Sequence, residues 1–115
     1  MLPKPQRLNL KTDFKWVASG KKLESLYLKL FFKYGENKLP RFGIALSSKT
    51  FKNAVERNRA KRLVAQALQQ ASSQLPPSIN IVVLPKNGVV EVKSDDVLKD
   101  LEQILSNEKI INQTH

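Results

Sequence analysis

A run of mostly apolar residues, Ile79 to Leu84 (INIVVL), limits the possible folds more than any other feature of the sequence. Its length and composition are typical of a central β-strand with little solvent exposure. The chain has 115 residues, enough for one compact domain and too few for two independent cores. We therefore expect a single domain, residues 1–115, with this strand inside its sheet.

The first half of the chain predicts a short helix and two strands. Thr12 can cap the helix, and Gly20 can end it. From Leu26 to Lys33, apolar residues alternate with aromatic and basic ones, which predicts a strand with one buried face. A second strand is expected from Arg41 to Ser47. Because a polar stretch separates the two strands, we expect them to form a hairpin.

The second half predicts two longer helices, one on each side of the apolar run. The segment Ala54 to Ala71 is rich in helix-favouring residues, and Ser94 can cap a last helix that has an apolar stripe. The order helix, strands, helix, strand, helix indicates an α+β sandwich. Loose ends are expected at residues 1–6 and 107–115, since chain termini are often poorly ordered.

The charge of the chain points to a polyanionic partner. The net charge is +10, far beyond what solubility requires. Up to Arg62 there are sixteen Lys and Arg against four Asp and Glu, and from Leu63 onward there are four against six. This asymmetry favours a shaped binding surface in the first half of the chain. The alternative is a generally basic surface with no specific partner.

Other protein classes are disfavoured by what the sequence lacks. It has no cysteine, which excludes disulfides, zinc–thiolate sites and thiol nucleophiles. No stretch approaches the roughly 20 apolar residues that cross a bilayer. The first residues also lack the apolar core of a signal peptide. We expect a cytoplasmic protein without a membrane partner.

Basic residues surround more than half of the helix expected at 54–71. Its core face is formed by Ala60, Leu63, Val64, Ala67 and Leu68. Arg57 and Lys61 border that face, whereas Arg59 lies nearly opposite Arg57. Cations on several sides suit a helix embedded in folded RNA. The alternative is an ordinary solvated face on which Glu56 pairs with Arg59 or Lys52.

One block of the sequence resembles a known family. The residues ERNRAKR at Glu56 to Arg62 follow NAV at Asn53 to Val55 and the strand RFGIALSSK at Arg41 to Lys49. This block resembles the RNR motif region of the bacterial ribonuclease P protein component. The similarity extends over residues 6–105. It departs from the family at Ala18, where a second aromatic residue is common, and at Ala65, where a further arginine is common.

The resemblance implies a fold and an activity. Proteins of this family bind a large catalytic RNA, and the holoenzyme removes 5′ leaders from precursor tRNAs. The RNA performs the hydrolysis with Mg²⁺, so no catalytic residue, metal site or cofactor is expected on the protein. The implied fold is a ribosomal protein S5 domain 2-like two-layer sandwich, ordered helix, three strands, helix, strand, helix, with a left-handed βαβ crossover. The implied partners are ribonuclease P RNA and precursor tRNA, with no small-molecule substrate.

The resemblance also assigns roles to residues. The RNR helix contacts the catalytic RNA through Arg57, Asn58, Arg59, Lys61 and Arg62. The leader is expected in a cleft between the first helix and the sheet, lined by Phe14, Tyr27, Lys29, Phe31 and Lys33. An aromatic ring there can stack on a base of any sequence, although Phe14 could instead belong to the core. Further basic support is expected from Arg7, Lys11, Arg41, Lys49 and Lys52.

Two other functions remain open at this point. A small ribosomal protein or an RNA chaperone would share the basic charge and the α+β pattern, and a cleft for single-stranded RNA would distinguish them from the ribonuclease P subunit. A nuclease without an RNA subunit would need a general base, a nucleophile or a carboxylate-bound metal. The only histidine is His115, and the pair Asp95 and Asp96 fits a helix N-terminus better than a metal site.

Overall fold

The computed structural model of the protein describes residues 2–110. Its centre is a four-stranded sheet with the strand order β1-β2-β4-β3. The strands are β1 (Lys21–Glu24), β2 (Leu28–Tyr34), β3 (Arg41–Ile44) and β4 (Ile79–Pro85). The α-helices are α1 (Leu10–Ala18), α2 (Ala54–Ala71) and α3 (Ser94–Asn107). Short 3-10 turns occur at η1 (Lys4–Gln6), η2 (Ser72–Gln74) and η3 (Asn87–Glu91).

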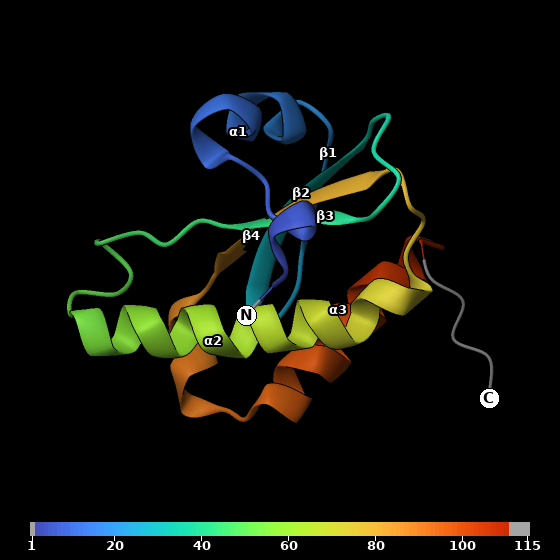
Figure 1. Ribbon diagram of the computed structural model, residues 1–115. Coiled ribbons are helices and arrows are strands. Elements are labelled where there is room, and N and C mark those ends of the chain that lie inside the picture. Colours follow the sequence, from blue (N-terminus) through green and yellow to red (C-terminus); the bar gives the residue numbers. More distant parts are fainter. Residues whose placement is uncertain (1, 111–115) are drawn as a thin grey trace.

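The helices cover the two faces of the sheet unequally (Figure 1). Helices α2 and α3 pack together on one face, and the short helix α1 lies across the other. The first face carries the buried side chains Leu28, Leu30 and Phe32 of β2. This arrangement confirms the α+β sandwich, with α1 added on the second face.

Strand β4 is the central strand that its apolar sequence predicts. It pairs with β2 in the antiparallel direction and with β3 in the parallel direction. Every residue of β4 except Leu84 is buried. A strand with neighbours on both sides and helices over both faces has little contact with water, which explains why it lacks polar alternation.

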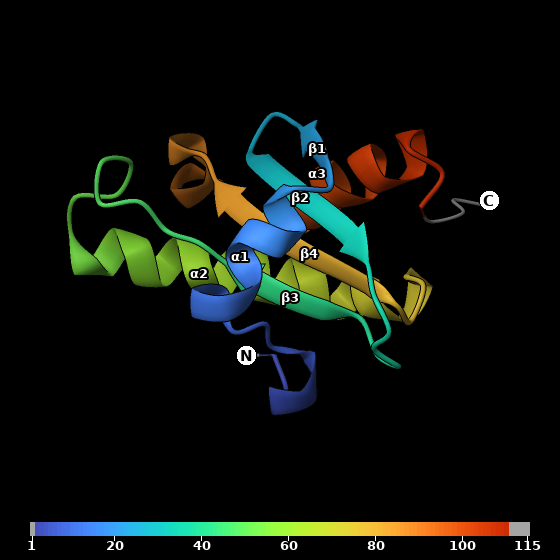
Figure 2. The ribbon, with the colours of Figure 1, turned by 90° about the horizontal axis from the view of Figure 1, so that it is seen from above.

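The connection from β3 through α2 to β4 has the left-handed sense that the resemblance implies. In Figure 2, β3 and β4 both run to the left, α2 runs back to the right behind the sheet, and β4 lies above β3. Parallel βαβ connections are right-handed in the great majority of proteins. The crossover is therefore a strong signature of the fold.

Two expectations about the strands were wrong. Strands β2 and β3 do not form a hairpin, because β4 lies between them and pairs with both. Strand β1 was missed in the residue patterns, although the resemblance implies a third strand before α2. Three of its four residues are charged and only Leu23 is buried, so this short edge strand shows no apolar alternation.

Several element boundaries also differ from the expected ones. Asn9, not Thr12, caps α1, and its side chain accepts a hydrogen bond from the backbone two residues later. Leu26 lies before β2 and is 73% exposed. Lys93 occupies the cap position of α3, so Ser94 is the first helical residue. The bounds of α2 agree with the prediction.

The segment before α1 packs against the domain. Leu2 is buried, and Arg7 Nε donates a hydrogen bond to its carbonyl oxygen at 2.7 Å. Arg7 also forms an isolated bridge beside Phe42 of β3. After α3, Ile110 packs against the core. The rest of the loose C-terminal end that we expected, residues 111–115, lies outside the described residues.

Candidate RNA-binding surface

The first turn of α2 presents its basic residues without neutralising them. Asn53 Oδ1 accepts a hydrogen bond from the Glu56 amide at 2.8 Å, and Asn53 Nδ2 donates to Glu56 Oε1 at 3.0 Å. Glu56 therefore pairs with its helix cap and not with Arg59 or Lys52. The two ion pairs found among residues 2–110 both lie outside α2. The positive charge of α2 remains available to a partner.

Three of the RNR side chains point into solvent. Asn58, Lys61 and Arg62 are exposed, and none of them forms a side-chain hydrogen bond or ion pair within residues 2–110. Together with Val55, which is 77% exposed, they line a shallow hollow of about 540 Å³. A planar guanidinium, an ammonium and an amide group beside an exposed methyl surface can contact both phosphates and bases.

The other two RNR residues are held by the protein itself. Arg57 Nη1 donates to the carbonyl oxygen of Phe51 at 3.0 Å, before α2. Arg59 Nε donates to the carbonyl oxygen of Val90 in η3 at 2.8 Å. A guanidinium carries five N–H donors, so each arginine keeps donors for a partner after making one such bond. These contacts orient the two side chains and join α2 to its neighbouring loops.

Helix α1 crosses one face of the sheet (Figure 2). This face carries a second group of basic residues. Lys29, Phe31 and Lys33 alternate with the buried residues of β2, so they point toward this face. Phe14 is half-buried on the side of α1 that carries the fully buried Val17. The structure therefore places Phe14, Lys29, Phe31 and Lys33 on the same side of the sheet, and we call these four residues the cleft face.

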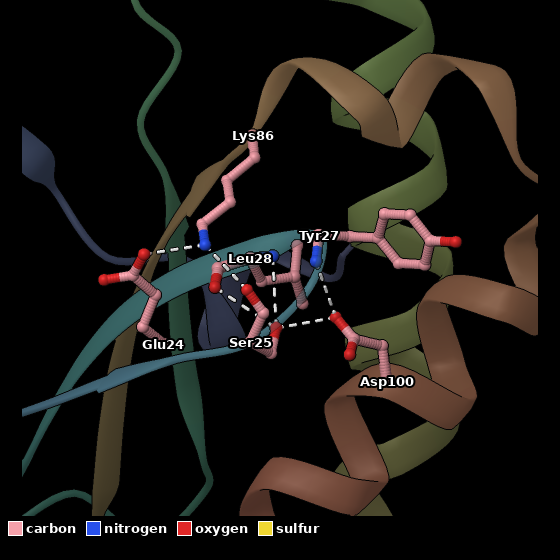
Figure 3. A network of polar contacts seen from close by, with 6 residues as sticks. All are labelled: Glu24, Ser25, Tyr27, Leu28, Lys86 and Asp100. Atoms are coloured by element: carbon pink, nitrogen blue, oxygen red, sulfur yellow. Dashed lines mark hydrogen bonds and ion pairs between the residues drawn. The ribbon is translucent and has the colours of Figure 1, made fainter.

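Tyr27 does not belong to the cleft face. It lies in the turn before β2 and packs at the margin of the hydrophobic core, beside η3. Its expected place in the cleft is therefore wrong, because the alternation that predicts it begins only at Leu28. Figure 3 shows its ring directed away from the neighbouring polar groups.

Those polar groups form a network that holds the turn between β1 and β2 (Figure 3). Asp100 Oδ2 of α3 accepts hydrogen bonds from Ser25 Oγ at 2.6 Å and from the Tyr27 amide at 3.0 Å. Lys86, just after β4, donates to the Ser25 carbonyl oxygen at 2.7 Å and pairs with Glu24 at 2.7 Å. The hydrogen bond and charge of Lys86 lower the pKa of Glu24.

The supporting basic residues are distributed around both surfaces. Arg41 lies opposite Asn80 in the register and is exposed on the same face of the sheet as the cleft face. Lys11 is exposed near the start of α1, and Arg7 is held at Leu2 as described above. Lys49 and Lys52 are exposed in the segment that leads into α2. These two lysines extend the basic surface of α2 toward β3.

A hollow near the end of β2 was not predicted. It is lined by Trp16 of α1, Tyr34 of β2 and Asn80 of β4, among other residues. Trp16, Tyr34 and Asn80 are far apart in the sequence, and Trp16 lies on a different side of α1 from Phe14. No local pattern therefore joins them.

The described part of the chain offers neither a metal centre nor a membrane span. Within residues 2–110, no three acidic or histidine side chains come close enough to hold a metal ion. None of the helices in this range is long and apolar enough to cross a membrane.

The fold and this surface define a class of small, basic α+β proteins suited to a nucleic acid partner. The chain belongs to the ribonuclease P protein component family: the family model described as Ribonuclease P matches residues 2–109. A ribonuclease P protein component from Pseudanabaena is 34% identical, covering 97% of this chain and 98% of the relative. One from Nitrosococcus oceani is 35% identical over 79% of this chain and 76% of the relative.

Solved structures agree with this assignment. The ribonuclease P protein from Thermotoga maritima has a TM-score of 0.77 and 28% identity, covering 88% of this chain and 96% of that protein. A Staphylococcus aureus ribonuclease P protein mutant has a TM-score of 0.81 over 94% of this chain and 92% of its own, and at 22% identity it supports the fold alone. The resemblance inferred from the RNR block is confirmed, and the family name implies part of a tRNA-processing enzyme.

Proposed function

We propose that the chain is the accessory protein subunit of a ribonuclease P. In this role it binds the catalytic RNA and the 5′ leader of precursor tRNA, and it assists removal of the leader. The RNA carries out the hydrolysis with Mg²⁺, and the protein contributes binding and orientation. The observation that carries the proposal is the helix α2, whose exposed cations meet no carboxylate among residues 2–110.

Helix α2 is the proposed contact to the catalytic RNA. Arg62 can form planar, bidentate contacts to phosphate, and Lys61 supplies a mobile point charge. Asn58 adds a donor and an acceptor that can read a base or a ribose. Because all three are exposed without internal partners, binding breaks no contact within the protein.

The cleft face is the proposed contact to the leader. Its two rings, Phe14 and Phe31, can stack on bases without regard to sequence, and Lys29 and Lys33 can follow the phosphates. This combination suits a substrate whose leaders differ from one tRNA to another. A ribosomal protein or a general RNA chaperone would not need leader-dependent binding.

Single-turnover cleavage of a precursor tRNA tests the proposal. The ribonuclease P RNA of the same organism is used at low Mg²⁺, with and without the protein, on substrates that differ only in leader length. We expect strong stimulation that increases when a leader is present. No stimulation, together with tight binding to ribosomal RNA, would refute the proposed role. Cleavage by the protein without added RNA would instead indicate a protein nuclease.

A further inference from the structure

A small pocket lies where the segment before α1 passes the edge of the sheet. In Figure 2 this segment lies beside β3, on the side away from β4. The amide of Leu8 donates to the carbonyl oxygen of Phe42 at 2.8 Å, so the segment adds to the open edge of β3. The pocket has a volume of about 190 Å³ and is lined by this segment, the start of α1, β3 and α2. We call it the Leu2 pocket.

The walls of the Leu2 pocket are mainly apolar. The apolar side chains that line it are Leu2, Leu8, Leu10, Phe42, Ile44 and Ala65. Gly43 lets Leu10 approach β3, because a Cβ atom on this glycine would lie 2.5 Å from Leu10 Cδ2. Ala65 is 3% exposed and carries a single methyl group, so α2 leaves space at this point. An engineered apolar cavity of about 150 Å³ accepts benzene, so the Leu2 pocket has room for a ring of this size.

The wall formed by the N-terminal segment is held by its own hydrogen bonds. The Gln6 amide donates to the Pro3 carbonyl oxygen at 2.9 Å, and the Arg7 amide donates to the next carbonyl oxygen along the chain at 3.1 Å. Arg7 Nε donates to the Leu2 carbonyl oxygen at 2.7 Å, which closes the segment around this turn. Two prolines also restrict the backbone of the segment. A wall that is already formed lowers the entropic cost of binding a small ligand.

Two basic side chains adjoin the apolar walls. Arg7 and Lys61 both line the pocket, and both are exposed. Among the described residues, no acidic side chain lines the pocket, and neither cation forms an ion pair. Because Arg7 uses Nε to hold Leu2, its two terminal nitrogens remain in the planar arrangement that matches a carboxylate. The charge of the lining therefore favours an anion.

The size and polarity of the pocket favour a small carboxylate over a nucleotide. Pockets for larger ligands have volumes of about 300–1,000 Å³, so the Leu2 pocket suits one ring with one charged group. Apart from the two cations, no lining side chain carries a hydrogen-bonding group. A nucleobase placed there would lose the hydrogen bonds of its amino and carbonyl groups. A benzene ring has no such groups to satisfy.

We propose that the Leu2 pocket binds a small aromatic carboxylate, with the ring between the N-terminal segment and α2 and the carboxylate at Arg7 and Lys61. Lys61 also lines the hollow on α2 that carries Asn58 and Arg62. The bound ligand therefore competes with RNA for Lys61. Only this second step rests on the proposed function, so ligand binding is tested without RNA.

Benzoate is the first probe, titrated into the full-length protein and followed by the amide NMR signals of Leu8, Gly43 and Ala65. We expect a Kd of roughly 0.1–1 mM, since the ligand has few heavy atoms. Benzyl alcohol and benzylamine lack the negative charge and acetate lacks the ring, so each should bind at least about 5-fold more weakly. Equal binding of benzyl alcohol would refute the role of the two cations. Tighter binding of adenosine monophosphate would overturn the proposal in favour of a nucleotide site.

Variants test the position of the ring and of the carboxylate. Ala65→Leu places a larger side chain in the pocket and should weaken benzoate binding at least about 10-fold. Lys61→Gln should weaken it roughly 2- to 5-fold, whereas the matched control Lys99→Gln, which removes an exposed charge from α3, should leave it unchanged. Full affinity in a folded Ala65→Leu would refute the site. If this variant does not fold, benzoate-induced shifts away from Leu8, Gly43 and Ala65 in the unmodified protein would refute it instead.

Filter binding of ribonuclease P RNA tests the competition. Saturating benzoate should weaken RNA binding by roughly 10-fold or more, because it removes one charge-assisted contact. Acetate at the same ionic strength controls for screening of the phosphates by salt and should have little effect. Unchanged RNA affinity with benzoate bound would refute the competition. If benzoate does not bind while the protein still stimulates cleavage, this inference fails and the proposed function stands.

Discussion

Replacing Arg62 by alanine should weaken RNA binding without destabilising the fold. The Arg62 side chain is exposed and makes no hydrogen bond or ion pair within residues 2–110, so we expect the free energy of unfolding to change by less than about 0.5 kcal/mol. Loss of one charge-assisted contact should cost about 1.5–3 kcal/mol of binding to ribonuclease P RNA. The plot of log K against log salt should become shallower by roughly 0.7–0.9, the value for one phosphate.

Filter binding over a range of salt concentrations and urea unfolding measure the two effects. Lys99→Ala is the matched control, because it removes one exposed positive charge from α3 instead of α2. Arg59→Ala is a useful contrast, since it also removes the bond to the Val90 carbonyl oxygen and should lower the stability. Equal changes of slope for Arg62→Ala and Lys99→Ala would show that only net charge matters, and an unchanged slope for Arg62→Ala would refute the phosphate contact.

Three further predictions concern the leader, the turn network and pH. Phe14→Ala should weaken binding of precursor tRNA with a long leader by about 1–3 kcal/mol, and an equal loss on leaderless tRNA would indicate damage to the fold. Asp100→Ala should lower the free energy of unfolding by about 2–3 kcal/mol because two donors lose their acceptor, whereas exposed Asp95→Ala should cost less than about 1 kcal/mol in the same urea titration. Lys86→Met should raise the pKa of Glu24 in a carboxyl NMR titration. Because Lys86 lowers that pKa, the Lys86–Glu24 pair stabilises the fold above the ordinary pKa of glutamate, and this stabilisation is lost as pH falls through the lowered value. An unchanged pKa of Glu24 in Lys86→Met would contradict this prediction.

The sequence predicts elements well where one signal acts alone. Helix α2 has favourable residues throughout and a polar break after it, and both of its ends agree with the structure. Strand β4 is apolar because it is central, and its apolar run can be recognised in the sequence without knowing which strands pair with it. Strand β1 owes its existence to pairing with β2, and four residues at a sheet edge carry too little pattern to show it. The pairing of β4 between β2 and β3 is a long-range choice that local patterns do not encode.

The candidate site divides in the same way. The RNR block can be found from its motif, and alternation along β2 places Lys29 and Phe31 on one face. The bonds of Arg57 and Arg59 to carbonyl oxygens depend on loops that the motif does not describe. The hollow near the end of β2 joins residues from α1, β2 and β4, so only the folded chain brings them together.

The central place of β4 affects how the protein is made. During synthesis on the ribosome, residues 1–78, which carry a net charge of +12, emerge before β4, and β2 and β3 then have no strand between them. The sheet can be completed only after residues 79–85 leave the exit tunnel, so all the basic residues of α2 are made before the strand that completes the sheet. RNA that bound this basic segment before β4 was made would compete with folding, so the late position of the central strand links folding of this protein to the rate of its synthesis.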